Sequence, residues 1–175
     1  MSSHGALTAK IGDFLGISLN PNGYDVFHDH GKQKANVGKI VSWFGDAERP
    51  QRTTELSQLD IAIIERKSGH VVLLAEIEET NDTPKGLIAD AYATLMADKV
   101  TFRRKPLDVG VWTTLLILGK GPRRNERRNM HLSDLVEAGR YGLATGNAAI
   151  GHVIIESFDG EADLRVRLLE VIPAS

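Results

Sequence analysis

Apolar positions recur along this 175-residue chain at two different spacings, and the two spacings predict helices and strands in turn. A spacing of three or four residues predicts helices over residues 5–18, 84–98 and 122–139. Continuous or alternating Val, Ile and Leu predict strands over 37–44, 59–66, 70–78, 108–120, 149–158 and 162–172. Apart from the strand at 37–44, residues 24–58 have no clear pattern, and 45–55 resembles a loop. The order predicts an α/β fold: a single domain over residues 1–175, with a central mixed sheet flanked by helices.

Two of these strands, 59–66 and 70–78, are expected to form a hairpin. Lys67-Ser68-Gly69 separates them, and a three-residue loop that ends in Gly suits a type I turn followed by a left-handed residue. If Arg66 and His70 close the loop, the register pairs Ile64 with Val72, Ala62 with Leu74 and Asp60 with Glu76.

Carboxylates gather at one end of this hairpin. Glu76 and Glu78 are two residues apart and therefore point to one side of their strand, and the register brings Asp60 to the same side. The rest of that face is apolar, so the three acids would repel one another and raise one another's pKa values. A divalent cation would remove the repulsion, and hard oxygen ligands favour Mg²⁺ or Mn²⁺.

Asp60, followed on the next strand by Glu76-Ile77-Glu78 within an αβββαβ order, resembles the PD-(D/E)xK nuclease superfamily, which has the restriction-endonuclease-like fold. The resemblance spans the first helix to the strand near residue 118. Asp60 takes the place of the first acid and Glu76 that of the second. Glu78 stands where the pattern has lysine, as in some restriction enzymes, and Leu59 stands where proline is common.

The resemblance implies a metal-dependent endonuclease that hydrolyses phosphodiester bonds of nucleic acid, with DNA expected, and by analogy a homodimer. Asp60 and Glu76 would hold Mg²⁺ or Mn²⁺, while Glu78 would share the ion or act as general base. Lys85, in the first turn of the next predicted helix, is the nearest substitute for the absent lysine. Two alternatives stay open. One is a catalytically inactive relative that binds nucleic acid or protein, and the other is an unrelated α/β protein with acids on its surface.

The charge distribution adds a candidate phosphate-binding surface. The net charge is −2, yet residues 101–128 contain eight basic residues against Asp108 and Glu126. Arginines at a spacing of four would form one helical face that contacts the phosphate backbone or is merely solvated. These arginines are Arg123, Arg124, Arg127 and Arg128.

Other features of the sequence favour plainer interpretations. His28-Asp29-His30 suits a turn better than a metal site, because no third ligand follows at a fixed spacing. Trp43 and Trp112 are expected in the core. The chain has no cysteine, which excludes disulfides and thiol catalysis. It also has no apolar run long enough to span a membrane and no signal-peptide pattern, so a cytoplasmic protein is expected.

Overall fold

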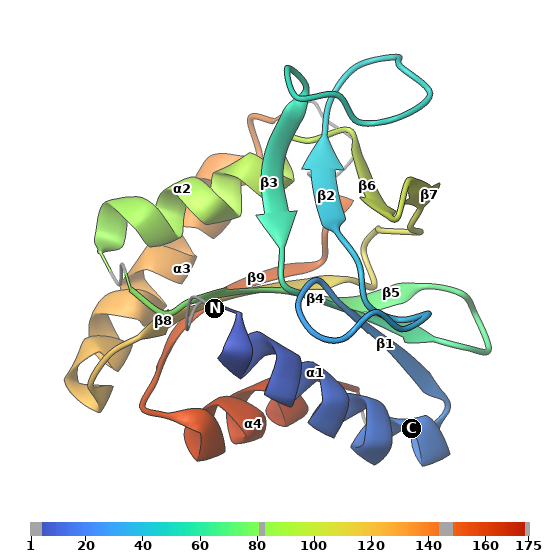
Figure 1. Ribbon diagram of the computed structural model, residues 1–175. Helices are drawn as coiled ribbons and strands as arrows, with labels where there is room; N and C mark the ends of the chain where they lie inside the picture. Colours follow the sequence, from blue (N-terminus) through green and yellow to red (C-terminus); the bar gives the residue numbers. More distant parts are fainter. Residues whose placement is uncertain (1–4, 81–82, 144–148, 174–175) are drawn as a thin grey trace.

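A five-stranded mixed sheet with helices on both faces forms the centre of the fold (Figure 1). The computed structural model describes residues 5–80, 83–143 and 149–173. β4 runs antiparallel to both of its neighbours, whereas β5, β8 and β9 are parallel to one another. The predicted α/β class with a mixed sheet is therefore confirmed. In spatial order the strands are β1 (Tyr24–His28), β4 (Ile61–Glu65), β5 (Val71–Glu78), β8 (Thr114–Lys120) and β9 (His152–Phe158).

Two pairs of helices cover the two faces of this sheet. α1 (Ala6–Leu19) and α4 (Glu161–Glu170) lie below it in Figure 1, and α2 (Pro84–Leu95) and α3 (Glu126–Arg140) lie on the other side. Because side chains alternate along each strand, the buried strands contribute to two separate apolar clusters. Ile61 and Ile63 of β4 pack in the cluster of α1 and α4, whereas Ala62 packs in the cluster of α2 and α3.

A smaller antiparallel sheet stands beside α2. Its strands, in spatial order, are β3 (Glu55–Leu59), β2 (Ile40–Trp43), β6 (Lys99–Phe102) and β7 (Lys105–Pro106). The strand predicted over 37–44 belongs here and not to the central sheet, whose first strand, β1, lies in the stretch without a clear pattern. Ile40, Leu59 and Phe102 join the cluster of α2 and α3, so the inner face of this second sheet packs on the common core.

The predicted strand over 59–66 is interrupted at Asp60. Leu59 ends β3 in the second sheet, and Ile61 begins β4 in the central sheet, so Asp60 occupies the bend between the two. The hairpin register holds at its inner end, where Ala62 lies opposite Leu74. A bulge then sets Ile64 opposite Val71 instead of Val72. Gly69 has φ 77°, as the proposed turn requires.

The last predicted strand, 162–172, is a helix. Leu164, Val166 and Leu168 alternate as in a strand, but Leu164 and Leu168 are fully buried while Val166 is 50% exposed. A strand would place all three on one face, whereas a helix places only residues four apart together. Glu161 and Asp163 lie in the first turn, where acids favour a helix N-terminus.

The predicted core residue Trp112 is instead partly exposed. The strand predicted over 108–120 begins only at Thr114, and Trp112 lies in the turn before it, 40% exposed, with its ring stacked 3.9 Å from that of His70. The prediction of Trp43 as a core residue is correct, since it is 1% exposed.

Gly12 is where α1 packs most closely on β1. A Cβ atom there would lie 2.3 Å from the buried ring of His28. Gly12→Ala should therefore lower the free energy of unfolding by about 1–3 kcal/mol through overpacking. Gly16→Ala is the matched control, because a Cβ at Gly16 meets no atom within 4 Å and should stabilise the helix by about 0.5–1 kcal/mol. Urea unfolding measures both, and equal effects would refute the packing account.

Candidate metal centre

Acidic side chains from three strands meet at one end of the central sheet. Because β4 is antiparallel to β1 and β5, its start lies beside their ends. Asp29 directly follows β1, Asp60 directly precedes β4, and Glu76 lies near the end of β5. The topology thus brings together residues that are far apart in the sequence. The hypothesis that Asp60 and Glu76 cluster agrees with this arrangement.

Asp60 is held in place by both its backbone and its side chain. Its N–H donates to Ala75 O, and its carbonyl accepts from the N–H of Asp29, each at 3.0 Å, so it continues the pairing between β1 and β5. Its side chain is only 8% exposed. The Ile77 N–H donates to Asp60 Oδ2 at 2.7 Å, and the Thr8 hydroxyl of α1 donates to Oδ1 at 3.5 Å.

Asp29 and His30 complete a compact group with Asp60. One potential ligand atom from each of these residues lies within 4.8 Å of the other two. The Asp29 side chain is 3% exposed; its Oδ2 accepts from Gln58 Nε2 at 2.9 Å and lies 3.3 Å from His30 Nε2. In the sequence, the histidine segment has no third potential ligand at a fixed spacing. The fold brings Asp60 beside Asp29 and His30, although no fixed spacing connects the two segments.

Burial and mutual repulsion raise the pKa values of the acids at this site. Burial raises the pKa of Asp60 to about 8, with a further contribution from the charge of Asp29. Burial raises the pKa of Glu76 to about 10, and the charges of Asp60 and Asp90 raise it further. Without a cation these carboxyl groups therefore hold protons at neutral pH.

Two more acids border the same site, Glu78 at the end of β5 and Asp90 on α2. Glu78 Oε1 accepts hydrogen bonds from the backbone N–H and the hydroxyl of Thr80, each at 2.8 Å. Burial raises the pKa of Asp90, and the charge of Glu78 raises it further. Asp90 lies on α2. The sequence does not single it out, because the spacing of residues along a helix does not show which of them face the end of a strand. We call Asp29, His30, Asp60, Glu76, Glu78 and Asp90 the carboxylate cluster.

The donor set of the carboxylate cluster fits a hard divalent cation. Asp29 Oδ1 and Glu76 Oε2 are buried and have no hydrogen-bond partner among the described residues. Within the same residues, no lysine or arginine forms an ion pair with Asp29, Asp60 or Glu76. Buried carboxylates are normally paired or coordinate a metal. Carboxylate oxygens with one imidazole suit Mg²⁺ or Mn²⁺, and Mn²⁺ accepts nitrogen more readily.

The basic residues singled out in the sequence lie outside this group. Lys85 is exposed in the first turn of α2, whose N-cap is Thr83, and forms no ion pair with a described carboxylate. Arg124 lies in the 3₁₀ turn η2 (Arg123–Asn125) before α3, so the expected four-arginine helical face is split between two elements. Arg124 and Arg127 are exposed, and Arg128 Nε donates to Asn129 Oδ1 at 2.8 Å. The side chain of Arg123 lies outside the described part.

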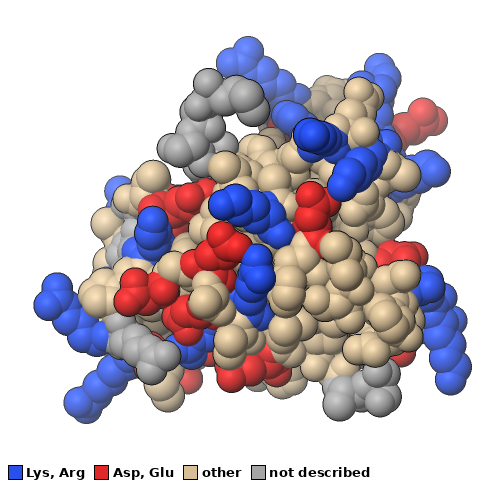
Figure 2. All heavy atoms as spheres, turned by 60° about the horizontal axis from the view of Figure 1, so that its bottom comes forward, with Lys and Arg blue, Asp and Glu red and all other residues tan. Residues whose placement is uncertain are grey.

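Acidic and basic side chains alternate over the face that carries α1 and α4, with no broad basic surface there (Figure 2). Arg167 of α4 pairs with Glu126 and Asp163, and Arg165 pairs with Glu161. These arginines are therefore committed to ion pairs within the protein.

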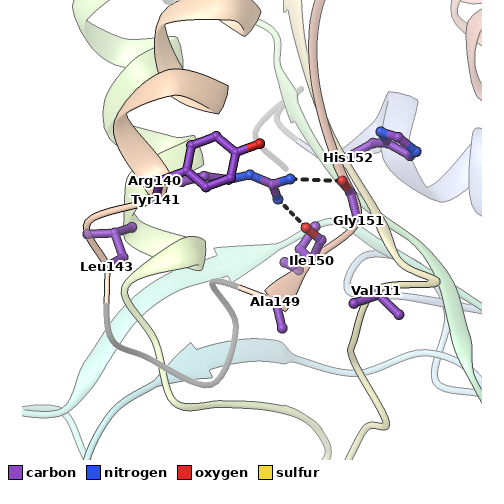
Figure 3. A pocket seen from close by; sticks show the side chains of 8 residues that line it. All are labelled: Val111, Arg140, Tyr141, Leu143, Ala149, Ile150, Gly151 and His152. Atoms are coloured by element: carbon purple, nitrogen blue, oxygen red, sulfur yellow. Dashed lines mark hydrogen bonds between the residues drawn. The ribbon is translucent and has the colours of Figure 1, made fainter.

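A cavity of about 570 Å³ lies at the opposite end of the central sheet, where β9 begins (Figure 3). Arg140 dominates its wall, but its guanidinium donates to the carbonyls of Ile150 and Gly151, and its Nε lies 2.7 Å from Glu137 Oε2. This arginine is occupied in holding α3 on β9, and we assign the cavity no ligand.

Comparison of the chain with protein-family models, with curated proteins and with solved structures finds no match. Among the described helices, none has the length and apolarity needed to cross a membrane.

Proposed function

We propose that the protein is a metal-dependent endonuclease that hydrolyses phosphodiester bonds in nucleic acid, with DNA as the expected substrate. One observation carries the proposal. Buried carboxylates from three strands converge at one end of the central sheet, and no lysine or arginine among the described residues neutralises Asp29, Asp60 or Glu76. Such a group is stable in its ionised form only with a cation, and a cation beside a bound phosphate is suited to its hydrolysis.

The order of elements around the central sheet supports the PD-(D/E)xK resemblance. Omitting the second sheet, the chain runs α1, β1, β4, β5, α2, β8, which is an αβββαβ order. Asp60 directly precedes β4 and Glu76 lies on the neighbouring β5, in the order that the resemblance gives to the first and second acids. Ligands of open α/β sheets commonly bind where parallel strands end, and the carboxylate cluster lies at the end of β5.

Asp60 and Glu76 would hold Mg²⁺ or Mn²⁺, with Asp29 and His30 completing the site on the side of β1. The cation would stabilise the negative charge that develops on the phosphate oxygens during hydrolysis. Asp60 and Glu76 must release their protons for it to bind, so its affinity rises with pH. Glu78, whose Oε1 accepts hydrogen bonds from Thr80, would accept a proton from the attacking water in this proposal.

The exposed Arg124 and Arg127 would contact the phosphate backbone in this proposal and provide sequence-independent affinity. Cleavage of both strands of a duplex by a single site of this size favours a homodimer, in which each copy cuts one strand.

Glu78 in the place of the motif lysine favours a second candidate function. A relative that lost the lysine would bind nucleic acid or protein without cutting. Incubation of the purified protein with plasmid and single-stranded DNA in Mg²⁺ and in Mn²⁺, with calorimetric titration of each ion, separates the two functions. Cleavage supports the nuclease, binding of the ion without cleavage of any substrate supports the inactive relative, and the absence of ion binding refutes both metal proposals.

The chemistry at the third motif position gives a separate prediction. Glu78→Ala should lower single-turnover cleavage by about a hundredfold, because general-base catalysis contributes at least that much. Glu78→Lys should keep measurable activity, since it restores the usual residue. Lys85→Ala should slow cleavage without weakening ion binding if Lys85 replaces the motif lysine. Wild-type rates for both alanine variants, measured with a labelled duplex, would refute this account of the chemistry.

A further inference from the structure

The outer face of the second sheet contains a cavity of about 410 Å³, which we call the second-sheet cavity. Three basic residues, Lys39, Arg103 and Arg104, line it together with Thr101 and Glu55. None of these three basic residues forms an ion pair with a carboxylate in the described part of the chain. The cavity therefore keeps an excess of positive charge that the protein itself does not neutralise.

The strand register places these side chains on one face. Val41 of β2 lies opposite Thr101 of β6, and the N–H of Arg103 donates to Lys39 O at 3.0 Å. Residues two apart on a strand share a face, so Lys39, directly before β2, follows Val41. The intervening residues of both strands point to the other face, in the apolar core. Alternation thus places Val41 and Thr101 in the cavity wall, and the turn after β6 adds Arg103 and Arg104 to its lining.

Arg103 is fixed before any ligand arrives. Its guanidinium donates to the carbonyls of Lys34 and Val37, with Nε 2.9 Å from Val37 O. Hydrogen bonds to carbonyl oxygens orient the guanidinium but do not neutralise its positive charge. Arg103 and Arg104 both have positive φ, 47° and 69°, a strained conformation for residues other than glycine. The turn between β6 and β7 therefore holds two arginines at the rim of the cavity at some cost in stability.

Thr101 supplies an independent sign of a missing partner. It lines the cavity, is 3% exposed, and its Oγ1 forms no hydrogen bond with the described residues. A buried hydroxyl without a partner costs about 1–3 kcal/mol. An oxyanion held by the neighbouring arginines and lysine would provide the acceptor that this hydroxyl lacks.

The cavity lies on the same surface as the carboxylate cluster. Gln58, which donates to Asp29, lies opposite Val41, and Val41 lies opposite Thr101. Neighbouring strands are about 4.8 Å apart, so Gln58 and Thr101 are separated by about 10 Å. Along the axis of a duplex, where each nucleotide of a strand rises by about 3.4 Å, that distance corresponds to about three nucleotides.

We propose that the second-sheet cavity binds a backbone phosphate of a nucleic-acid strand, a few nucleotides from the phosphate at the carboxylate cluster. The choice of nucleic acid as ligand rests on the proposed function. Lys39, Arg103 and Arg104 contact the phosphate oxygens, and Thr101 donates its hydroxyl. Glu55 opposes this charge and limits the affinity, so Glu55→Gln should tighten binding.

The test is fluorescence anisotropy of labelled single-stranded and duplex oligonucleotides in Mg²⁺ across a range of salt concentrations. Glu76→Gln serves as the background, so that the strand stays uncut. The combined variant Lys39→Ala/Arg104→Ala should bind about a hundredfold more weakly, about tenfold for each charged contact, with a salt slope shallower by about two. Its control is Lys10→Ala/Lys67→Ala, which removes the same charge from exposed positions on α1 and in the hairpin turn.

Thr101→Val separates binding from folding. The nearly isosteric change removes the unpaired hydroxyl, so the free protein should melt at a higher temperature while it binds the oligonucleotide several-fold more weakly. A purely structural role of Thr101 would not lower binding while raising stability. Titration with inorganic phosphate, followed by the amide NMR signal of Thr101, distinguishes a free anion from a backbone phosphate.

The outcomes separate this inference from the proposed function. If both cavity variants bind like the lysine control, with the same salt slope, the inference is wrong even if the wild type cuts nucleic acid. If inorganic phosphate binds and oligonucleotides do not, the inference is also wrong. If oligonucleotides bind through the cavity but the wild type never cuts them, the inference stands and the nuclease proposal fails.

Discussion

Asp60→Asn and Glu76→Gln should each abolish metal-dependent cleavage while leaving the protein folded and, without metal, more stable. Both substitutions keep the shape of the side chain but remove the charge that would bind the cation. The loss in turnover should be at least about a hundredfold, the scale on which one electrostatic contact to a transition state acts. Stability near neutral pH should rise because each buried acid must take up a proton when the chain folds, whereas a neutral amide needs none.

The opposite signs of these two effects make the test specific, since a variant that merely unfolds loses activity and stability together. Asp25→Asn is a matched control, because Asp25 is an exposed acid of β1 that lies outside the carboxylate cluster. Turnover near the wild-type level for either cluster variant, with contaminating nucleases excluded by repeated purification, would show that the site is assigned wrongly.

The second prediction is that the metal-free protein loses stability as the pH rises from about 4 towards 8. Asp60 and Glu76 have folded-state pKa values of about 8 and about 10, while in an unfolded chain they titrate near pH 4. Between these limits the folded state holds more protons than the unfolded state, so the free energy of unfolding falls with pH. The slope is at most about 1.4 kcal/mol per pH unit for each such group.

A divalent cation should reverse this trend. Mg²⁺ or Mn²⁺ at about a hundredfold excess over its dissociation constant adds about 2.7 kcal/mol, and its affinity grows as the carboxyl groups lose protons. The measurement is thermal unfolding from pH 5 to 8 with EDTA and with each ion. The combined variant Asp60→Asn/Glu76→Gln serves as the reference, because all other groups titrate alike in it. If the melting temperatures of wild type and variant change with pH in the same way, the assignment of these pKa values is wrong.

The part of the site that could be predicted from the sequence is the part carried by local rules. Gly69 in a three-residue loop predicted the hairpin and its register as far as the bulge beside Ile64, and strand alternation predicted that Glu78 and Glu76 point the same way. Asp29 and Asp90 could not be found this way. They reach the site because β1 pairs with β4 and because α2 packs over the end of β5, and both contacts depend on the whole fold.

The errors in the predicted fold have the same origin. β1 is only five residues long and lies between turns, so its alternating pattern is too short to stand out. α4 has apolar residues at positions that suit both periods, and only burial against α1 and the central sheet decides between them. Trp112 looks like a core residue by type, yet the backbone turns before β8 and leaves its ring on the surface against His70.

The bend at Asp60 has a topological consequence. The chain leaves the central sheet at Asp29, forms β2 and β3, and returns to the central sheet at Asp60. The segment between these residues is therefore a long loop whose two ends lie side by side. A cation bound by both residues would close this loop at its base, much as a disulfide closes a loop, and would reduce the conformational entropy of the open segment. Slower amide exchange throughout β2 and β3 on addition of Mg²⁺ would then report an ion that none of their own side chains touches.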